Sequence, residues 1–338
     1  MNIKRIRVPF AMLLFFISLM GIGKIVAAQT MSSFSVSPLN PETNQPQSSY
    51  YELTGKPNTK QTITLRVFNS SDHAIQIQLE ANNGSTNNNG ITSYLKEGDR
   101  DATLKVGFSD IATCEAQPMN IPANDSKDVS VTIQYPKKEF KGIILGGLRL
   151  YEVTEEEKQA NDVTNHVAYT VGVVLQESNE KISPEMHLLS AQPEQRNYHN
   201  YISATLQNAA PTMIKTLNVK ATVYKKSGKK KMYAHESSNL RMAPQSKFNY
   251  GINLEDQALK NGTYLMAVKG DADGVPFNFE KEFTIDKKEA KQLNENAVFV
   301  KGQANIPMWM ILIGILISIV LLGLLIYIFK LKVGEKNE

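Results

Sequence analysis

Short runs in which apolar and polar residues alternate recur along most of the chain, separated by clusters of Asn, Gly, Pro and Ser. A period of two is typical of β-strands with one buried face, so we expect strands at residues 61–68, 74–79, 129–135, 143–151, 167–175, 201–208 and 214–224. The first two runs flank the turn sequence 69–72 and predict a hairpin. Before the apolar C-terminal segment, helical spacing is confined to residues 155–159 and 287–296.

The second half of the chain repeats the plan of the first. Residues 201–208 resemble 63–69, and each run ends in an Asn turn. Residues 242–246 are similar to 121–126, and residues 259–269 have the same place in the second half as residues 140–148 have in the first. Many short strands with regular turn signals favour an all-β fold over other classes, and β-sandwiches over a barrel. We therefore expect two tandem immunoglobulin-like β-sandwich domains, at residues 29–181 and 182–286.

Both ends of the chain carry segments of another kind. Three basic residues precede an apolar run, and Val26-Ala27-Ala28 offers small residues before a cleavage point, which predicts a signal peptide at 1–28. Residues 307–329 are uncharged and mostly aliphatic, long enough to cross a bilayer, and Lys330 and Lys332 follow. We expect a single-pass protein of the cell membrane with a stalk at 287–306, a transmembrane helix at 307–329, a cytoplasmic tail at 330–338, and its ectodomain outside, facing the cell wall.

Charge becomes informative once the signal peptide is set aside. The chain has 37 basic and 33 acidic residues, and the signal peptide holds four of the basic ones, so the mature protein is balanced. Residues 29–181 carry 13 basic and 19 acidic residues, whereas residues 182–305 carry 17 and 12. The balanced total therefore combines an acidic first domain with a basic second domain. This difference in charge is informative about binding partners rather than about the fold.

No catalytic constellation stands out. The single cysteine, Cys114, excludes an internal disulfide and is expected to be a small core hydrophobe. The five histidines are widely spaced and outside metal-ligand motifs, and Ser71-Asp72-His73 cannot form a triad from adjacent turn positions. We expect no enzyme activity, cofactor or metal. Two alternatives remain open: a wall-active hydrolase or transpeptidase, and an accessory sensor subunit of the envelope.

Three features are candidates for binding. Five lysines surround a Ser-Gly turn between two apolar strands, and they form either a solvated turn or a contact for an anionic polymer. The Asn-rich tract 82–90 is expected to be a mobile loop tip for glycan or partner contact. Paired strand glycines permit close approach of a sugar or another backbone, or mark a bulge. The lysines are Lys225, Lys226, Lys229, Lys230 and Lys231, and the glycines are Gly146 and Gly147.

Several motifs together resemble the WxL-interacting protein family of Gram-positive bacteria. They are Phe34–Gln45, Lys141–Leu148, Met242–Phe248, Asn261–Tyr264, Phe283–Ile285 and Leu293-Asn294. The resemblance implies a peptidoglycan-binding first domain and a host-binding second domain. It also implies partners of four kinds: WxL-domain surface proteins, peptidoglycan, a host extracellular-matrix component or anionic glycan, and the membrane through the C-terminal helix. It implies no nucleic acid.

Overall fold

The computed structural model describes residues 32–47, 50–96, 98–114, 118–153, 167–227, 230–255, 257–298, 312–313 and 315–323. The predicted signal peptide, the cytoplasmic tail and the expected helix at 155–159 lie outside these residues. Of the predicted transmembrane segment, residues 312–313 and 315–323 are described, as helix. No helix formed by the described residues is long and apolar enough to cross a membrane.

The chain is mainly β, and its first half builds two sheets. One sheet has the order β1-β3-β9-β7 and the other β2-β11-β10-β4-β8, and a two-stranded ribbon, β5-β6, lies outside both. The elements are β1 (Phe34–Leu39), β2 (Tyr50–Thr54), β3 (Lys60–Asn69), β4 (Ile75–Asn83), β5 (Ser85–Thr86), β6 (Thr92–Ser93), α2 (Phe108–Ile111), β7 (Ala112–Cys114), β8 (Met119–Ile121), β9 (Ser126–Gln134), β10 (Ile144–Glu152) and β11 (Ala168–Gln176).

The second half also builds two sheets, with the orders β12-β13-β16 and β15-β14-β17-β18. The elements are β12 (Met186–Arg196), β13 (His199–Asn208), β14 (Ile214–Lys225), β15 (Lys230–Met242), β16 (Ser246–Asn253), β17 (Gly262–Ala272), β18 (Val275–Ile285) and α3 (Lys287–Asn296). Because β11 ends at residue 176 and β12 begins at 186, the expected boundary at 181 lies in the connection between them.

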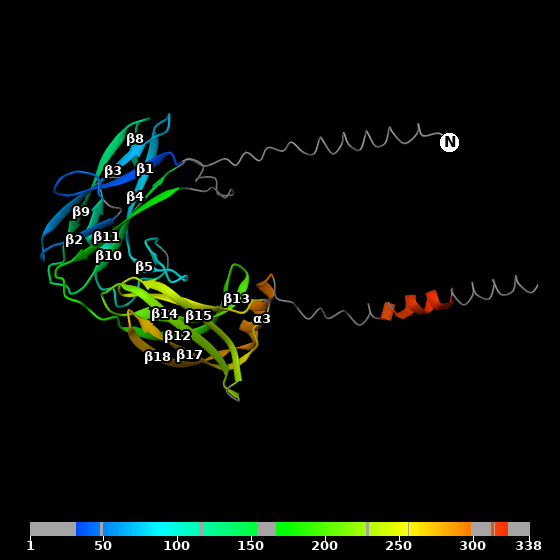
Figure 1. Ribbon diagram of the computed structural model, residues 1–338. Helices are drawn as coiled ribbons and strands as arrows, with labels where there is room; N and C mark the ends of the chain where they lie inside the picture. Colours follow the sequence, from blue (N-terminus) through cyan, green and yellow to red (C-terminus); the bar gives the residue numbers. More distant parts are fainter. Residues whose placement is uncertain are drawn as a thin grey trace, which may run out of the picture.

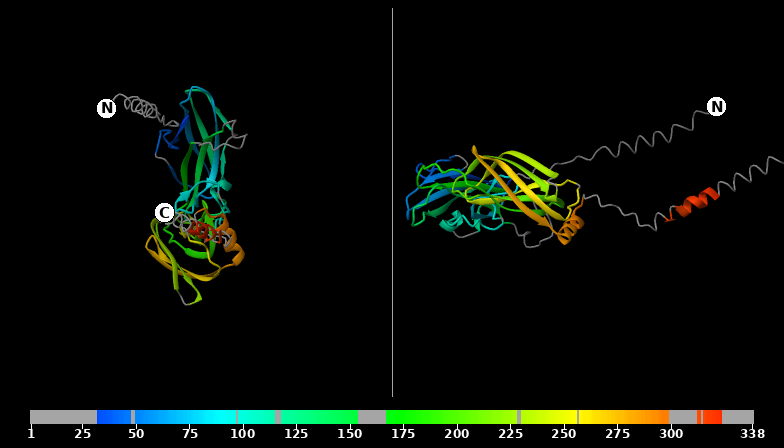
Figure 2. Two further views of the ribbon diagram at one scale, coloured as in Figure 1. Left: turned by 90° about the vertical axis from the view of Figure 1, so that its right-hand side faces the viewer. Right: turned by 90° about the horizontal axis from the view of Figure 1, so that it is seen from below.

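Each pair of sheets encloses one hydrophobic core, which defines two β-sandwiches. The first core gathers buried side chains between Phe34 and Leu175, and the second between Ile202 and Ala290. In Figure 1 the first domain lies above the second, with β5 between them, and Figure 2 shows the same stacked arrangement from the side. The alternation along each strand thus places one face of every sheet against a core.

The predicted hairpin of residues 61–68 and 74–79 is wrong. β3 pairs with β1 and β9, whereas β4 pairs with β10 and β8 in the opposite sheet. The chain therefore crosses from one sheet to the other at residues 69–72. Both strands bury alternate residues in the same core, so alternation along the sequence does not distinguish two strands paired in one sheet from two strands facing each other across the sandwich.

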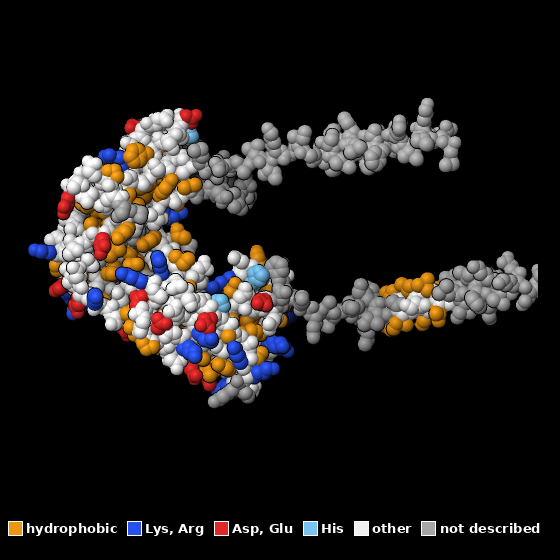
Figure 3. All heavy atoms as spheres, in the orientation of Figure 1, with side chains coloured by type: hydrophobic (Ala, Val, Ile, Leu, Met, Phe, Trp, Pro, Cys, Tyr) orange, Lys and Arg blue, Asp and Glu red, His pale blue; other side chains and the backbone are white. Residues whose placement is uncertain are grey.

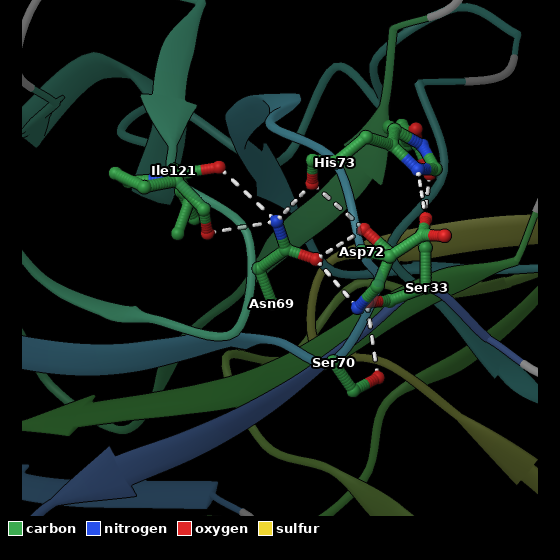
Figure 4. Close-up of polar contacts among 9 residues, drawn as sticks. Ser33, Asn69, Ser70, Asp72, His73 and Ile121 are labelled. Carbon is green, nitrogen blue, oxygen red and sulfur yellow. Dashed lines mark hydrogen bonds and ion pairs between the residues drawn. The ribbon is translucent and has the colours of Figure 1, made fainter.

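Asn69 holds this crossing together, as Figure 4 shows. Its Nδ2 donates to the backbone oxygens of His73 at 2.8 Å, Ile121 at 3.1 Å and Pro122 at 2.9 Å. Its Oδ1 accepts from the backbone N–H of Ser71 at 2.9 Å. The side chain is buried and satisfies backbone groups that the turn leaves outside the sheets.

Asn208 does the same in the second domain. Its Nδ2 donates to the backbone oxygens of Thr212 and Ala243, and its Oδ1 accepts from the N–H of Ala210. The partners two and four positions further along the chain match those of Asn69, and β13, β14, β16 and β17 pair as β3, β4, β9 and β10 do. The repeat seen in the sequence is therefore a repeat of strand pairing and of one buried asparagine at the crossing.

The helix expected at 287–296 forms with those bounds, and it packs on the second domain. Ala290 joins the second core, and Leu293 lies against it. The Asn294 side chain accepts from the backbone N–H of Leu259 at 2.8 Å and donates to its oxygen at 2.9 Å. The first ten residues of the expected stalk are thus attached to the folded domain.

Candidate binding site

The paired glycines of β10 are covered by the protein's own aromatic rings. A Cβ placed on Gly146 would lie 2.0 Å from Cγ of Phe108, a core residue of α2, and one on Gly147 would lie 2.5 Å from Cγ of Tyr94. β10 pairs in continuous register with both of its neighbours, so the glycines mark no bulge. The expected close approach exists, but these rings fill the space where a sugar or another backbone was expected.

The lysine hairpin, residues 225–231, connects β14 to β15. It projects from the end of the second domain that is remote from the first (Figures 1 and 2), and Figure 3 shows Lys and Arg side chains gathered over this domain. Lys225, Lys226, Lys230 and Lys231 are exposed, whereas Lys229 lies outside the described residues. Lys226 Nζ is 2.7 Å from the carboxylate of Glu282. This ion pair partly neutralises one of the five positive charges, and the hairpin presents a charged tip rather than a pocket.

A site that is more enclosed than the lysine hairpin is formed by an excursion of the first domain, residues 84–107. This segment follows β4 in the chain and ends where α2 begins. Tyr94, within the excursion, packs over Gly147, and its hydroxyl lies 3.1 Å from the Cβ position of Gly172 on the adjacent strand β11. The start of the excursion belongs to the Asn-rich tract 82–90, where we expected a mobile loop tip. Thr86 is instead buried against the second domain.

Hydrogen bonds join the excursion to the second domain. Thr86 Oγ1 lies 2.6 Å from Ser246 Oγ and accepts from the backbone N–H of Ala243 at 3.0 Å. Gln245 donates to the backbone oxygen of Thr103 at 2.6 Å. Buried polar groups that are satisfied only across the junction make separation of the domains unfavourable. The junction therefore holds the two sandwiches in a defined relation.

A buried carboxylate belongs to the same junction. Asp101 accepts from both Thr103 N and Thr103 Oγ1, and Gln207 of the second domain donates to its two oxygens at 2.8 and 2.9 Å. Burial alone would raise the pKa of Asp101, but the bonds from Thr103 and Gln207 and the charge of Lys247 together lower it. The charged form is therefore the one that the junction stabilises.

A cleft of about 610 Å³ opens between the excursion and the second domain. Most of the residues that line it have amide, hydroxyl or charged side chains; they come from residues 81–88, 93, 95–96, 98–101, 104 and 109 on one side and from Thr205 and residues 245–249 on the other. This volume falls in the range of ligand sites. Sequence reasoning missed the cleft, and the one signal for it was the asparagine tract 82–90.

The described residues offer binding surfaces rather than reactive groups. Ser71 Oγ is directed to Asn69 Oδ1 and to the backbone oxygen of His73, not to the imidazole. Cys114 is half-buried, and burial raises the pKa of its thiol, which disfavours the reactive thiolate. Among the described residues, no group of three His, Cys, Asp or Glu side chains is placed to hold a metal ion.

Two joined β-sandwiches that meet at a polar cleft have the architecture of a modular binding protein. Two family models match the chain: the WxL Interacting Protein peptidoglycan binding domain over residues 34–152, and the WxL Interacting Protein host binding domain over residues 158–295. The chain belongs to the WxL Interacting Protein family, with a peptidoglycan-binding domain followed by a host-binding domain. Both models describe binding domains and neither describes an enzyme. The second match includes β11, although that strand pairs within the first domain.

Similar solved structures include three that contain chaperones. They are the YadV chaperone (9% identity, 75% of this chain and 100% of that chain, TM-score 0.31), the Salmonella enterica SafA pilin in complex with the SafB chaperone (10%, 76% and 99%, 0.31) and the E. coli chaperone DraB (13%, 74% and 99%, 0.30). No conclusion rests on likenesses with such TM-scores. A search of the curated proteins found no match.

Proposed function

We propose that this protein is a non-enzymatic scaffold, anchored in the cell membrane, which links peptidoglycan, WxL-domain surface proteins and host ligands. The observation that carries the proposal is the tandem match to a peptidoglycan-binding and a host-binding domain on two joined sandwiches. The apolar sequence of residues 307–329 supports the anchor.

The arrangement of the domains suits simultaneous binding. The lysine hairpin projects away from the first domain, so a soluble or host ligand can reach it while the first domain is engaged with the wall. Lysine attracts anionic groups as a point charge without much geometric selectivity. We therefore assign the hairpin to contact with an anionic host glycan, and wall binding to the first domain.

Pull-down of the mature protein tests the proposal. Purified peptidoglycan and an immobilised WxL-domain protein are each incubated with it, and an unrelated exported β-sandwich protein serves as the control. We expect both to retain the protein and neither to retain the control. Failure of both to retain it would exclude a scaffold role, and release of soluble fragments from the wall would point to the enzymatic alternative.

A further inference from the structure

We propose that the cleft at the domain junction binds the disaccharide-peptide repeating unit of peptidoglycan, and that both domains hold it. This inference rests on the proposed function and deepens it, because it assigns wall recognition to a site shared between the domains. The hydrogen-bonding character of the cleft lining is the first reason for it.

Three asparagines of the lining have their side-chain oxygens engaged. Asn83, Asn87 and Asn88 each accept a bond from a backbone N–H, at 2.9, 3.2 and 3.0 Å respectively. This orientation leaves their Nδ2 groups as donors, and no other described residue accepts from them. The amides therefore favour a ligand that is rich in acceptors, such as the acetamido and hydroxyl oxygens of an N-acetylated sugar.

The charges of the lining point the same way. Arg100 is paired with Asp110, with bonds of 3.0 and 2.8 Å, and Asp101 is engaged by Gln207. Lys96, from the first domain, and Lys247, from the second, form no ion pair or side-chain hydrogen bond with another described residue. Asp99 also lines the cleft, is exposed and forms no ion pair with another described residue, so the cleft offers a ligand two ammonium groups and one carboxylate. The stem peptide of a muropeptide carries both carboxylates and amino groups, so it can pair with charges of both signs.

Polar clusters continue the site beyond the cleft on both domains. Asn82, at the cleft, donates to Glu80, and Arg149 lies near the same carboxylate with its guanidinium 4.6 Å from the ring centre of Tyr151. On the second domain, Asn249 at the cleft donates to Glu194, which also pairs with Arg196.

The guanidinium of Arg196 lies 4.9 Å from the ring centre of Tyr201, in the same way as that of Arg149 lies over Tyr151. An Arg–Tyr stack thus lies beyond the cleft on each domain, joined to it through Asn82 and Glu80 in the first and through Asn249 and Glu194 in the second. Flat, polar side chains of this kind contact sugar rings and peptide groups. Matching clusters on both sides fit an extended polymer that passes through the cleft rather than a small molecule that ends in it.

The test is the affinity of the intact mature chain for a soluble disaccharide-tetrapeptide, measured by titration calorimetry. We expect Lys96→Ala and Lys247→Ala each to weaken binding about tenfold, because each removes one charge-assisted bond. Lys127→Ala is the matched control, because Lys127 is exposed on β9 outside the cleft. We also expect the disaccharide without the peptide to bind more weakly than the complete unit.

Thermal unfolding of each variant separates a binding effect from a folding effect. Lys247 is close enough to Asp101 to affect its pKa, so if Lys247→Ala lowers the unfolding temperature, the exposed Lys96 carries the test. If wild-type protein binds insoluble peptidoglycan and both variants keep wild-type affinity for the muropeptide, the cleft assignment is overturned while the proposed function stands. If wild-type protein binds neither form, the proposed function fails as well.

Discussion

Replacing Asn69 by alanine removes the side chain that joins the sheets of the first domain at their crossing. Four backbone groups lose a partner: three carbonyl oxygens and the N–H of Ser71. The two Nδ2 protons are shared by the three carbonyl oxygens, and Oδ1 accepts from both N–H and Oγ of Ser71, so about four hydrogen bonds are lost. At about 1 kcal/mol per hydrogen bond, Asn69→Ala should lower the free energy of unfolding of the first domain by about 4 kcal/mol. That is a large fraction of the total for a domain of this size.

Urea unfolding followed by circular dichroism measures this loss, and Asn120→Ala is the matched control. Asn120 is exposed on β8, next to one of the carbonyls that Asn69 contacts, and its side chain has no hydrogen bond with another described residue. Its replacement should change stability by less than about 0.5 kcal/mol. If Asn69→Ala also stays within about 1 kcal/mol of wild type, the asparagine does not hold the crossing.

The variant Asn69→Asp tests the direction of the hydrogen bonds. It keeps an acceptor for Ser71 but turns a carboxylate oxygen toward three carbonyl oxygens, so at pH 7 it should be less stable than Asn69→Ala. Because only the protonated acid can donate there, the native state raises the pKa of the introduced carboxyl group, and part of the loss should be recovered as the pH falls toward about 4. A pH-independent difference between the two variants would contradict this assignment of the bonds.

Close packing at a glycine, a buried carboxylate and the lysine hairpin each allow a further test. Gly146→Ala should lower the free energy of unfolding by about 1–3 kcal/mol, because its Cβ would overlap the ring of Phe108. Gly172→Ala should cost less, because the nearest atom to its Cβ would be the Tyr94 hydroxyl at 3.1 Å. Equal losses would show that the Phe108 ring moves aside. The lowered pKa of Asp101 means that its stabilisation is present above its unfolded-state pKa and is lost as the pH falls through its folded-state pKa. Acid titration of unfolding should therefore show a larger loss of stability in wild type than in Asp101→Asn, in which the other carboxylates still titrate. Replacing all five lysines of the lysine hairpin by serine should shorten retention on heparin, with the wild-type retention falling as salt rises, and unchanged retention would leave the hairpin as a solvated turn.

Local pattern was enough to predict much of the fold. Alternation located β3, β4, β9, β10, β11, β13 and β14 but did not indicate β1, β2 or β12, and helical spacing located α3 with the bounds that the structure has. The repeat was visible because the asparagine crossings at 69 and 208 need the same residue type at the same offset from their turns. Which strands pair with each other could not be predicted in this way. β3 and β4 both bury alternate residues, and nothing in their sequences shows that they lie in opposite sheets.

The binding site was harder to predict because its parts are distant in sequence. The bond between Thr86 and Ser246 joins residues 160 positions apart, and the cleft exists only because the excursion reaches the second domain. The paired glycines correctly indicated close approach, but sequence alone did not reveal that Phe108 and Tyr94 occupy the space. The lysine hairpin was visible as a charge cluster, whereas its ion pair with Glu282 depends on the neighbouring sheet strands.

Co-sedimentation with insoluble peptidoglycan tests the central claim most directly. A WxL-domain protein is mixed with purified wall material with and without the mature protein, and the pellet is assayed for both proteins. A scaffold that holds wall and partner together predicts more WxL-domain protein in the pellet when the mature protein is present. An unchanged amount of WxL-domain protein, with the mature protein left in the supernatant, would contradict it.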